Sequence, residues 1–277
     1  MRYNGMQPTS PVEFILFNCD QAISSKPKRV FLLNRSILCV LWVSLSLGSE
    51  RKDPQITSRN ITFIGTSFNI VEHGDSPIHY IWLHGDEKTA QMALNYHIKK
   101  YSGKAFFIQN DSREIPYQET QIDPNRIFSR NGSFYALTKF KLDWSPGTLR
   151  TALDELDDEC QQFLEELIPD TNGILIAVHN NFRGYNVNKE VKHSKKVSIK
   201  KRQNPRDFIL CTHEKDFEIL SEGPYNVVLQ NELPASDDGS LSWESIRRNI
   251  RYVNVETRLG YLSKQKKMLE FIRETLN

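Results

Sequence analysis

The chain of 277 residues contains only four cysteines, and no two of them form a CxxC pair. This spacing argues against a zinc site built from cysteines. The 36 lysines and arginines nearly balance the 34 aspartates and glutamates, and a net charge of +2 gives no reason to expect a nucleic-acid partner. Internal repeats and low-complexity tracts are also missing. With 39% hydrophobic residues, the composition is that of an ordinary globular protein.

The N-terminal part has no apolar run long enough to span a bilayer comfortably. The run at residues 37–47 follows basic residues at 26–29 and ends in small residues before charged sequence. This is the layout of a secretory signal, whereas the alternative is a buried helix. We expect residues 1–49 to be an extension with a signal peptide and the protein to be periplasmic or secreted, with no stable membrane span. If the segment is not a signal, the protein is cytoplasmic.

Removal of this segment would leave only two cysteines, Cys160 and Cys211. An oxidising compartment would allow them to form one disulfide, although the sequence does not fix the distance between them. A disulfide between these residues is therefore an open alternative.

Residues 50–277 read as one domain in which short apolar runs alternate with helical patterns. Strands are expected within residues 60–73 (two, around Gly65), 79–85, 104–110, 172–181, 207–213, 226–231 and 251–257, and helices within 86–103, 145–168 and 261–276. This alternation predicts an α/β fold with a mostly parallel central sheet. The basic run at residues 189–206 is interpreted as a solvated loop or hairpin, with contact to an anionic polymer or membrane surface as the alternative.

Two of the predicted strands end in histidine, at His84 and His179. Ligands of parallel α/β sheets collect at the carboxyl ends of strands, so both histidines are candidates for one shared site. Glu87 follows His84 in an H-x-x-E turn, where residues three apart can face one centre. Two histidines, one glutamate and a water are the composition of a catalytic zinc site. Taken singly, each histidine could be structural, and Asp86 could be a turn residue or an acceptor behind the ligands.

Further polar residues could complete such a site. Arg126 could recognise a carboxylate or phosphate, and Asn125 beside it could add a neutral donor; the alternative is a polar turn. Arg113 could be a second cationic contact or a surface residue. Glu256 comes late in an apolar strand, where a carboxylate near a metal ion could be a general base. Without a metal it would only be an acid at a strand end.

The order of these motifs resembles that of the zinc carboxypeptidase superfamily, and "DPNRIF" at residues 123–128 is similar to a motif of its aspartoacylase and succinylglutamate desuccinylase branch. The resemblance covers about residues 60 to 275 and implies a three-layer α/β/α sandwich with a mixed sheet, which makes residues 50–277 the catalytic domain. It implies one Zn²⁺ per chain. The motif residues that carry it are His84, Glu87, Asn125, Arg126, His179 and Glu256.

The resemblance also implies roles for these residues. His84, Glu87 and His179 would bind the zinc, and Glu256 would activate a water and pass its proton to the leaving amine. The Asn-Arg pair would hold a substrate carboxylate, and Arg113 would take the role of the arginine that polarises the carbonyl. Two departures concern specificity: Asp86 stands where the family often has Asn, and the tyrosine expected on a loop before the catalytic glutamate is not evident.

Three functions are compatible with this sequence. The first is a metallopeptidase of the carboxypeptidase type, which would cut an amide bond near a free carboxylate in extracytoplasmic or cell-wall peptides. The second is a deacylase of N-acyl amino acids, which "DPNRIF" favours and the apparent signal segment disfavours. The third is a binding module without catalysis on the same fold, which the intact set of key residues disfavours.

Overall fold

The computed structural model describes residues 55–170, 172–182 and 184–276. The predicted extension and its signal peptide (residues 1–49) lie outside this part. Within the described ranges, no helix is both long enough and apolar enough to cross a membrane.

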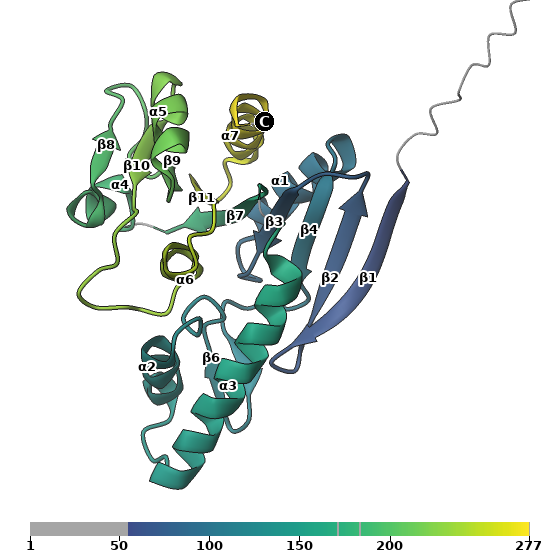
Figure 1. Cartoon of the computed structure of the whole chain (residues 1–277), viewed down its shortest axis with the longest axis vertical. Coiled ribbons are helices and arrows are strands. Elements are labelled where there is room, and N and C mark those ends of the chain that lie inside the picture. Colours follow the sequence, from purple (N-terminus) through teal and green to yellow (C-terminus); the bar gives the residue numbers. More distant parts are fainter. Residues whose placement is uncertain (1–54, 171, 183, 277) are drawn as a thin grey trace, which may run out of the picture. The chain divides into compact units, whose positions relative to one another are not determined.

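The described residues form a nine-stranded sheet in the order β1-β2-β4-β3-β7-β11-β9-β10-β8, together with a two-stranded sheet, β5-β6 (Figure 1). The strands are β1 (Ile56–Phe63), β2 (Thr66–His73), β3 (Ile78–Trp82), β4 (Gly103–Ile108), β5 (Ile115–Tyr117), β6 (Thr120–Ile122), β7 (Ile174–Asn181), β8 (Lys196–Ser198), β9 (Phe208–Cys211), β10 (Asn226–Leu229) and β11 (Tyr252–Arg258). The helices are α1 (Lys88–Lys100), α2 (Arg130–Phe140), α3 (Pro146–Leu167), α4 (Val187–Glu190), α5 (Glu214–Glu222), α6 (Leu241–Arg247) and α7 (Leu262–Thr275), with a 3₁₀ helix, η1 (Val191–His193).

The large sheet is mixed and mostly parallel, which confirms the predicted fold class. Its central strands β4, β3, β7 and β11 run parallel to one another. The antiparallel pairs lie outside them: β1 with β2, β2 with β4, β11 with β9, and β10 with β8. The carboxyl ends of β3, β7 and β11 therefore meet at one edge of the sheet, where α/β proteins bind ligands.

Consecutive residues of β3 show that helices cover both faces of the sheet. The His79 ring lies 2.7 Å from the carbonyl oxygen of Leu167 at the end of α3, whereas the Tyr80 hydroxyl lies 3.1 Å from the ring of His97 in α1. Since successive side chains of a strand point to opposite faces, α1 and α3 lie on opposite sides. Helices α5 and α7 belong to the layer of α1, because α7 packs against both α1 and α5.

Helix α3 shows why these segments fold as they do. The Ser145 side chain accepts a hydrogen bond from the Thr148 backbone N–H, and Pro146 occupies the first helical turn. Both features favour a helix start. Its buried stripe includes Phe163, which stacks on Phe63 of β1 with ring centroids 4.1 Å apart. The amphipathic pattern of residues 145–168 thus predicts both the helix and the face it buries.

The open alternative of a disulfide is wrong, because Cys160 and Cys211 are both buried and unpaired. The Cys160 thiol, in α3, donates to the carbonyl of Ile127, and the Cys211 thiol, in β9, donates to the carbonyl of Val228. Each thiol has its own acceptor in a different part of the core. The basic run at 189–206 contributes a short edge strand, β8, that pairs with β10.

Candidate metal centre and substrate pocket

The turn after β3 brings His84 and Glu87 together. The Nδ1 atom of His84 lies 2.9 Å from Oε1 of Glu87, and the Glu87 backbone N–H donates to the His84 carbonyl. Gly85 is required between them, because a Cβ atom there would lie 2.1 Å from the carbonyl oxygen of Asn110. Asp86 lies in the same turn, where its carbonyl accepts from the Lys88 N–H that begins α1.

His179 completes a group of three buried ligands. It lies in β7, and its Nδ1 atom is 2.9 Å from Oε2 of Glu87. One donor atom from each of His84, Glu87 and His179 lies within 4.8 Å of the others, and the three residues are at most 4% exposed. These three residues could therefore hold a metal ion.

The donor set fits a divalent cation. Both histidines direct a ring nitrogen at the same carboxylate, which is the arrangement that two neutral imidazoles and one anionic oxygen need around a common ion. The other ring nitrogen of His179, Nε2, is buried and has no hydrogen-bond partner among the described residues. A histidine that served only to fill the core would normally satisfy this atom.

Asp123 contacts the ring nitrogen of His84 that faces away from Glu87. Its Oδ1 atom lies 2.8 Å from Nε2 of His84, and its Oδ2 atom accepts from Nε of Arg113 at 3.2 Å. Arg113 also donates from Nη1 to Oε1 of Glu87 at 3.2 Å. A carboxylate that accepts from the outer nitrogen of a histidine is the usual support of a metal ligand, because it fixes the tautomer and the ring orientation.

The electrostatics of this group favour positive charge. Burial alone would lower the pKa of His84, but the carboxylates of Glu87 and Asp123 outweigh it and raise the pKa to about 9. Burial opposes ionisation of Glu87, yet His179 and His84 hold its pKa well below the ordinary value. His84 and Arg113 likewise hold the pKa of the buried Asp123 low. The carboxylates of Glu87 and Asp123 thus favour positive charge at this position.

Glu256 lies beside His179 on the neighbouring strand. In the parallel register of β7 and β11, Glu256 is the direct partner of His179, so both side chains emerge on the same face. The Glu256 carboxylate accepts from the side-chain amides of Asn181 at 3.0 Å and Asn254 at 3.3 Å. Burial raises its pKa, and Glu87 adds to this effect. Two neutral amides thus position the carboxylate, and its surroundings favour the protonated form more than water does.

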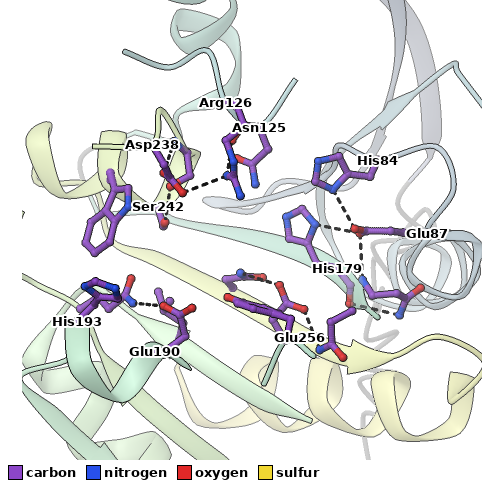
Figure 2. A pocket seen from close by; sticks show the side chains of 18 of the residues that line it. His84, Glu87, Asn125, Arg126, His179, Glu190, His193, Asp238, Ser242 and Glu256 are labelled. Carbon is purple, nitrogen blue, oxygen red and sulfur yellow. Dashed lines mark hydrogen bonds and ion pairs between the residues drawn. The ribbon is translucent and has the colours of Figure 1, made fainter. Parts of the chain in front are cut away.

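Asn125 and Arg126 reach the same pocket from the loop between β6 and α2. The side-chain oxygen of Asn125 accepts from the Leu241 backbone N–H at 2.9 Å, which leaves the amide nitrogen as a donor. Nη1 of Arg126 lies 3.5 Å from the Asp238 carboxylate. Figure 2 shows both side chains across the pocket from Glu256.

All seven residues predicted from the sequence line this one pocket, which has a volume of about 530 Å³. They are His84, Glu87, Arg113, Asn125, Arg126, His179 and Glu256. Sequence reasoning missed Asp123, although it begins the "DPNRIF" motif, and it also missed Glu190 and His193, which lie in the basic run. The only signal in that run was its many lysines, and they predicted a solvated loop.

Comparison with protein-family models, curated proteins and solved structures gives no match to this chain. Membership of the zinc carboxypeptidase superfamily therefore stays a prediction that rests on the residues of the site.

Proposed function

We propose that the protein is a zinc-dependent hydrolase that cleaves an amide bond next to a free carboxylate, as a carboxypeptidase-like enzyme acting on peptides. The observation that carries the proposal is the convergence of three groups in one pocket. The His84–Glu87–His179 set, the Glu256 carboxylate and the Asn125–Arg126 pair come from distant parts of the sequence. Extracytoplasmic peptides would be the substrates if the N-terminal extension is a signal.

His84, Glu87 and His179 would hold one Zn²⁺ per chain. Zinc supplies Lewis acidity, which polarises a carbonyl and lowers the pKa of a bound water. Glu256 would take a proton from the attacking water as its oxygen bonds to the carbonyl carbon. As the C–N bond breaks, Glu256 would return the proton to the leaving nitrogen.

The arginines would place the substrate. Arg126, with the Asn125 amide beside it, would hold the free carboxylate by charge-assisted hydrogen bonds. Nε and Nη1 of Arg113 are engaged by Asp123 and Glu87, so its remaining nitrogen, Nη2, would be the donor to the carbonyl oxygen of the scissile bond. Arg113 would thereby stabilise negative charge that develops on that oxygen.

Metal analysis and two variants test the site itself. The purified protein should contain about one zinc per chain, and His84→Ala should lose it. Glu256→Gln should keep the zinc and lose turnover, because glutamine has the same size and can still accept from one of the two asparagine amides but cannot carry the proton. Glu232→Gln, which changes an exposed carboxylate paired with Lys195, is the matched control. A wild type that folds without binding zinc would refute the metal site, and retained turnover in Glu256→Gln would remove Glu256 as the base.

A substrate panel tests the reaction. Zinc-loaded protein is offered peptides with a free or an amidated C-terminus and a set of N-acyl amino acids. The proposal requires cleavage of the free peptides and at least a tenfold loss on amidation, because the amide removes the charge that Arg126 would bind. Cleavage of only the N-acyl amino acids would support the deacylase instead. Binding without cleavage would support a binding module.

A further inference from the structure

The end of the pocket opposite the metal ligands carries a second acidic group. Figure 2 shows Glu190 and His193 across the cavity from His84 and Glu87, with Glu256 between the two ends. Glu190 ends helix α4, and His193 ends the adjoining helix η1. Both line the same pocket as the metal ligands, so a molecule bound at the metal could extend to them.

Glu190 is held in place by neutral groups. Its Oε2 atom accepts from Nε2 of Gln230 at 2.5 Å, and its carbonyl oxygen accepts from the Ser194 hydroxyl at 2.8 Å. Gln230 is itself 1% exposed and is anchored by its backbone N–H to the Cys211 carbonyl. The Tyr185 side chain also contacts this carboxylate. Burial, together with the Glu256 and Glu190 carboxylates, raises the pKa of Tyr185 well above its ordinary value. Tyr185 is therefore a neutral neighbour.

Both arginines at the pocket wall already have carboxylate partners, whereas the Glu190 carboxylate has no cationic partner among the described residues. Arg113 lies between Glu87 and Asp123, and Arg126 faces Asp238. In the part of the chain that the structure describes, no arginine, lysine or histidine nitrogen forms an ion pair with the Glu190 carboxylate. A half-buried carboxylate without a counter-ion raises the affinity of its surroundings for a cation.

The wall beside Glu190 also suits a cation. Trp243 lines the pocket there, and the His193 ring meets it nearly edge-on, with ring centroids 6.5 Å apart and an angle of 81° between the planes. The face of an indole attracts an ammonium or guanidinium group.

We infer that Glu190 determines specificity for a substrate with a cationic side chain, such as a C-terminal lysine or arginine or another diamino acid. This inference rests on the proposed function, because it takes Arg126 as the group that holds the substrate carboxylate. The carboxylate would bind at Arg126, the scissile amide would lie between the metal ligands and Glu256, and the cationic end would reach Glu190 and Trp243.

A matched substrate pair tests this specificity. Benzoylglycyl-lysine and benzoylglycyl-norleucine have side chains of similar length, but only lysine carries the ammonium group. Zinc-loaded wild type should prefer the lysine peptide in kcat/KM by about tenfold to hundredfold, which is the range for a hydrogen bond to a charged group. In Glu190→Gln the ratio of the two kcat/KM values should fall to near one. In Glu232→Gln, the control outside the pocket, the ratio should stay at the wild-type value.

The outcomes separate this inference from the proposed function. If both peptides are cleaved equally well, the inference that Glu190 determines specificity is wrong, and the proposed hydrolase function is retained. If neither these peptides nor any substrate of the wider panel is cleaved, the proposed hydrolase function is wrong. In that case the binding of both peptides to zinc-loaded Glu256→Gln, measured by calorimetry, still tests Glu190. Equal affinities there would overturn the inference, and tighter binding of the lysine peptide that Glu190→Gln removes would support it.

Discussion

The Nε2 atom of His84 lies 2.8 Å from Oδ1 of Asp123, and both side chains are buried. This contact fixes the ring of His84 so that Nδ1 faces Glu87 and the candidate metal position. Asp123 also accepts from the Asn125 backbone N–H at 2.8 Å. One carboxylate therefore links the orientation of a metal ligand to the loop that carries the proposed carboxylate-binding residues.

The first prediction concerns this link. Asp123→Asn keeps an oxygen for the Asn125 N–H but removes the negative charge behind His84. Zinc affinity, measured by competition with a chromogenic chelator, should fall by about tenfold to hundredfold, the usual effect of losing such a partner. Asp111→Asn, which removes an exposed carboxylate paired with Lys88, should leave the affinity unchanged. Equal zinc affinities in Asp123→Asn and wild type would contradict a supporting role for Asp123.

The second prediction concerns the turn that holds the ligands. Gly85→Ala would place a methyl group against the backbone of Asn110, so the turn must shift. We expect a loss of about 1–3 kcal/mol in the free energy of unfolding, typical of overpacking, and weaker zinc binding. The measurements are urea denaturation and chelator competition. Gly147→Ala is the matched control, since a Cβ there meets nothing within 4 Å and the residue lies in a helix. That variant should be at least as stable as wild type.

The strands that carry the site could be predicted from the sequence because their signals are local. The apolar runs before His84, His179 and Glu256 are each long enough to specify a buried strand, and all three strands are present. Parallel strands align their carboxyl ends, so shared topology suffices to bring these side chains together. The pairing of Glu256 with His179 follows from that register.

Other features depend on contacts that no local pattern encodes. For Cys160 and Cys211 the sequence left a disulfide open, because their distance depends on how α3 and β9 pack. Each thiol donates to a different carbonyl. Glu190 is surrounded by lysines in the sequence, which hides its contact with Gln230, 40 residues away. A site residue whose partners are distant in sequence can be recognised only after the sheet has been assembled.

The third prediction is that zinc stabilises the fold. Because the three ligands come from the turn after β3 and from β7, they are together only in the folded chain. Free zinc at one hundred times its dissociation constant should add about 2.7 kcal/mol to the free energy of unfolding. The melting temperature, measured by calorimetry with zinc and with a chelator, should rise in wild type and in Glu256→Gln. A similar rise in His84→Ala would contradict binding at this site.

The fourth prediction concerns a buried histidine away from the metal ligands. His97 in α1 is 1% exposed and faces the Tyr80 hydroxyl. Burial, with smaller effects of the nearby Arg273 and Lys100, lowers the pKa of His97 to about 4. The unfolded chain has a histidine pKa of about 6.5, so between pH 6.5 and 4 the unfolded state binds a proton that the folded state does not.

The free energy of unfolding should therefore fall by up to about 3 kcal/mol as the pH is lowered from 6.5 to 4. This contribution of His97 to stability is fully present above pH 6.5. His97→Gln, which can still accept from Tyr80 but does not titrate, should lose less stability over this range than wild type. Tyr80→Phe keeps the buried histidine and should retain the wild-type slope, because burial is the largest cause of the shift. Urea denaturation of the metal-free proteins at several pH values measures these slopes. A His97→Gln slope equal to that of wild type would show that His97 is protonated in the folded state as readily as in the unfolded chain.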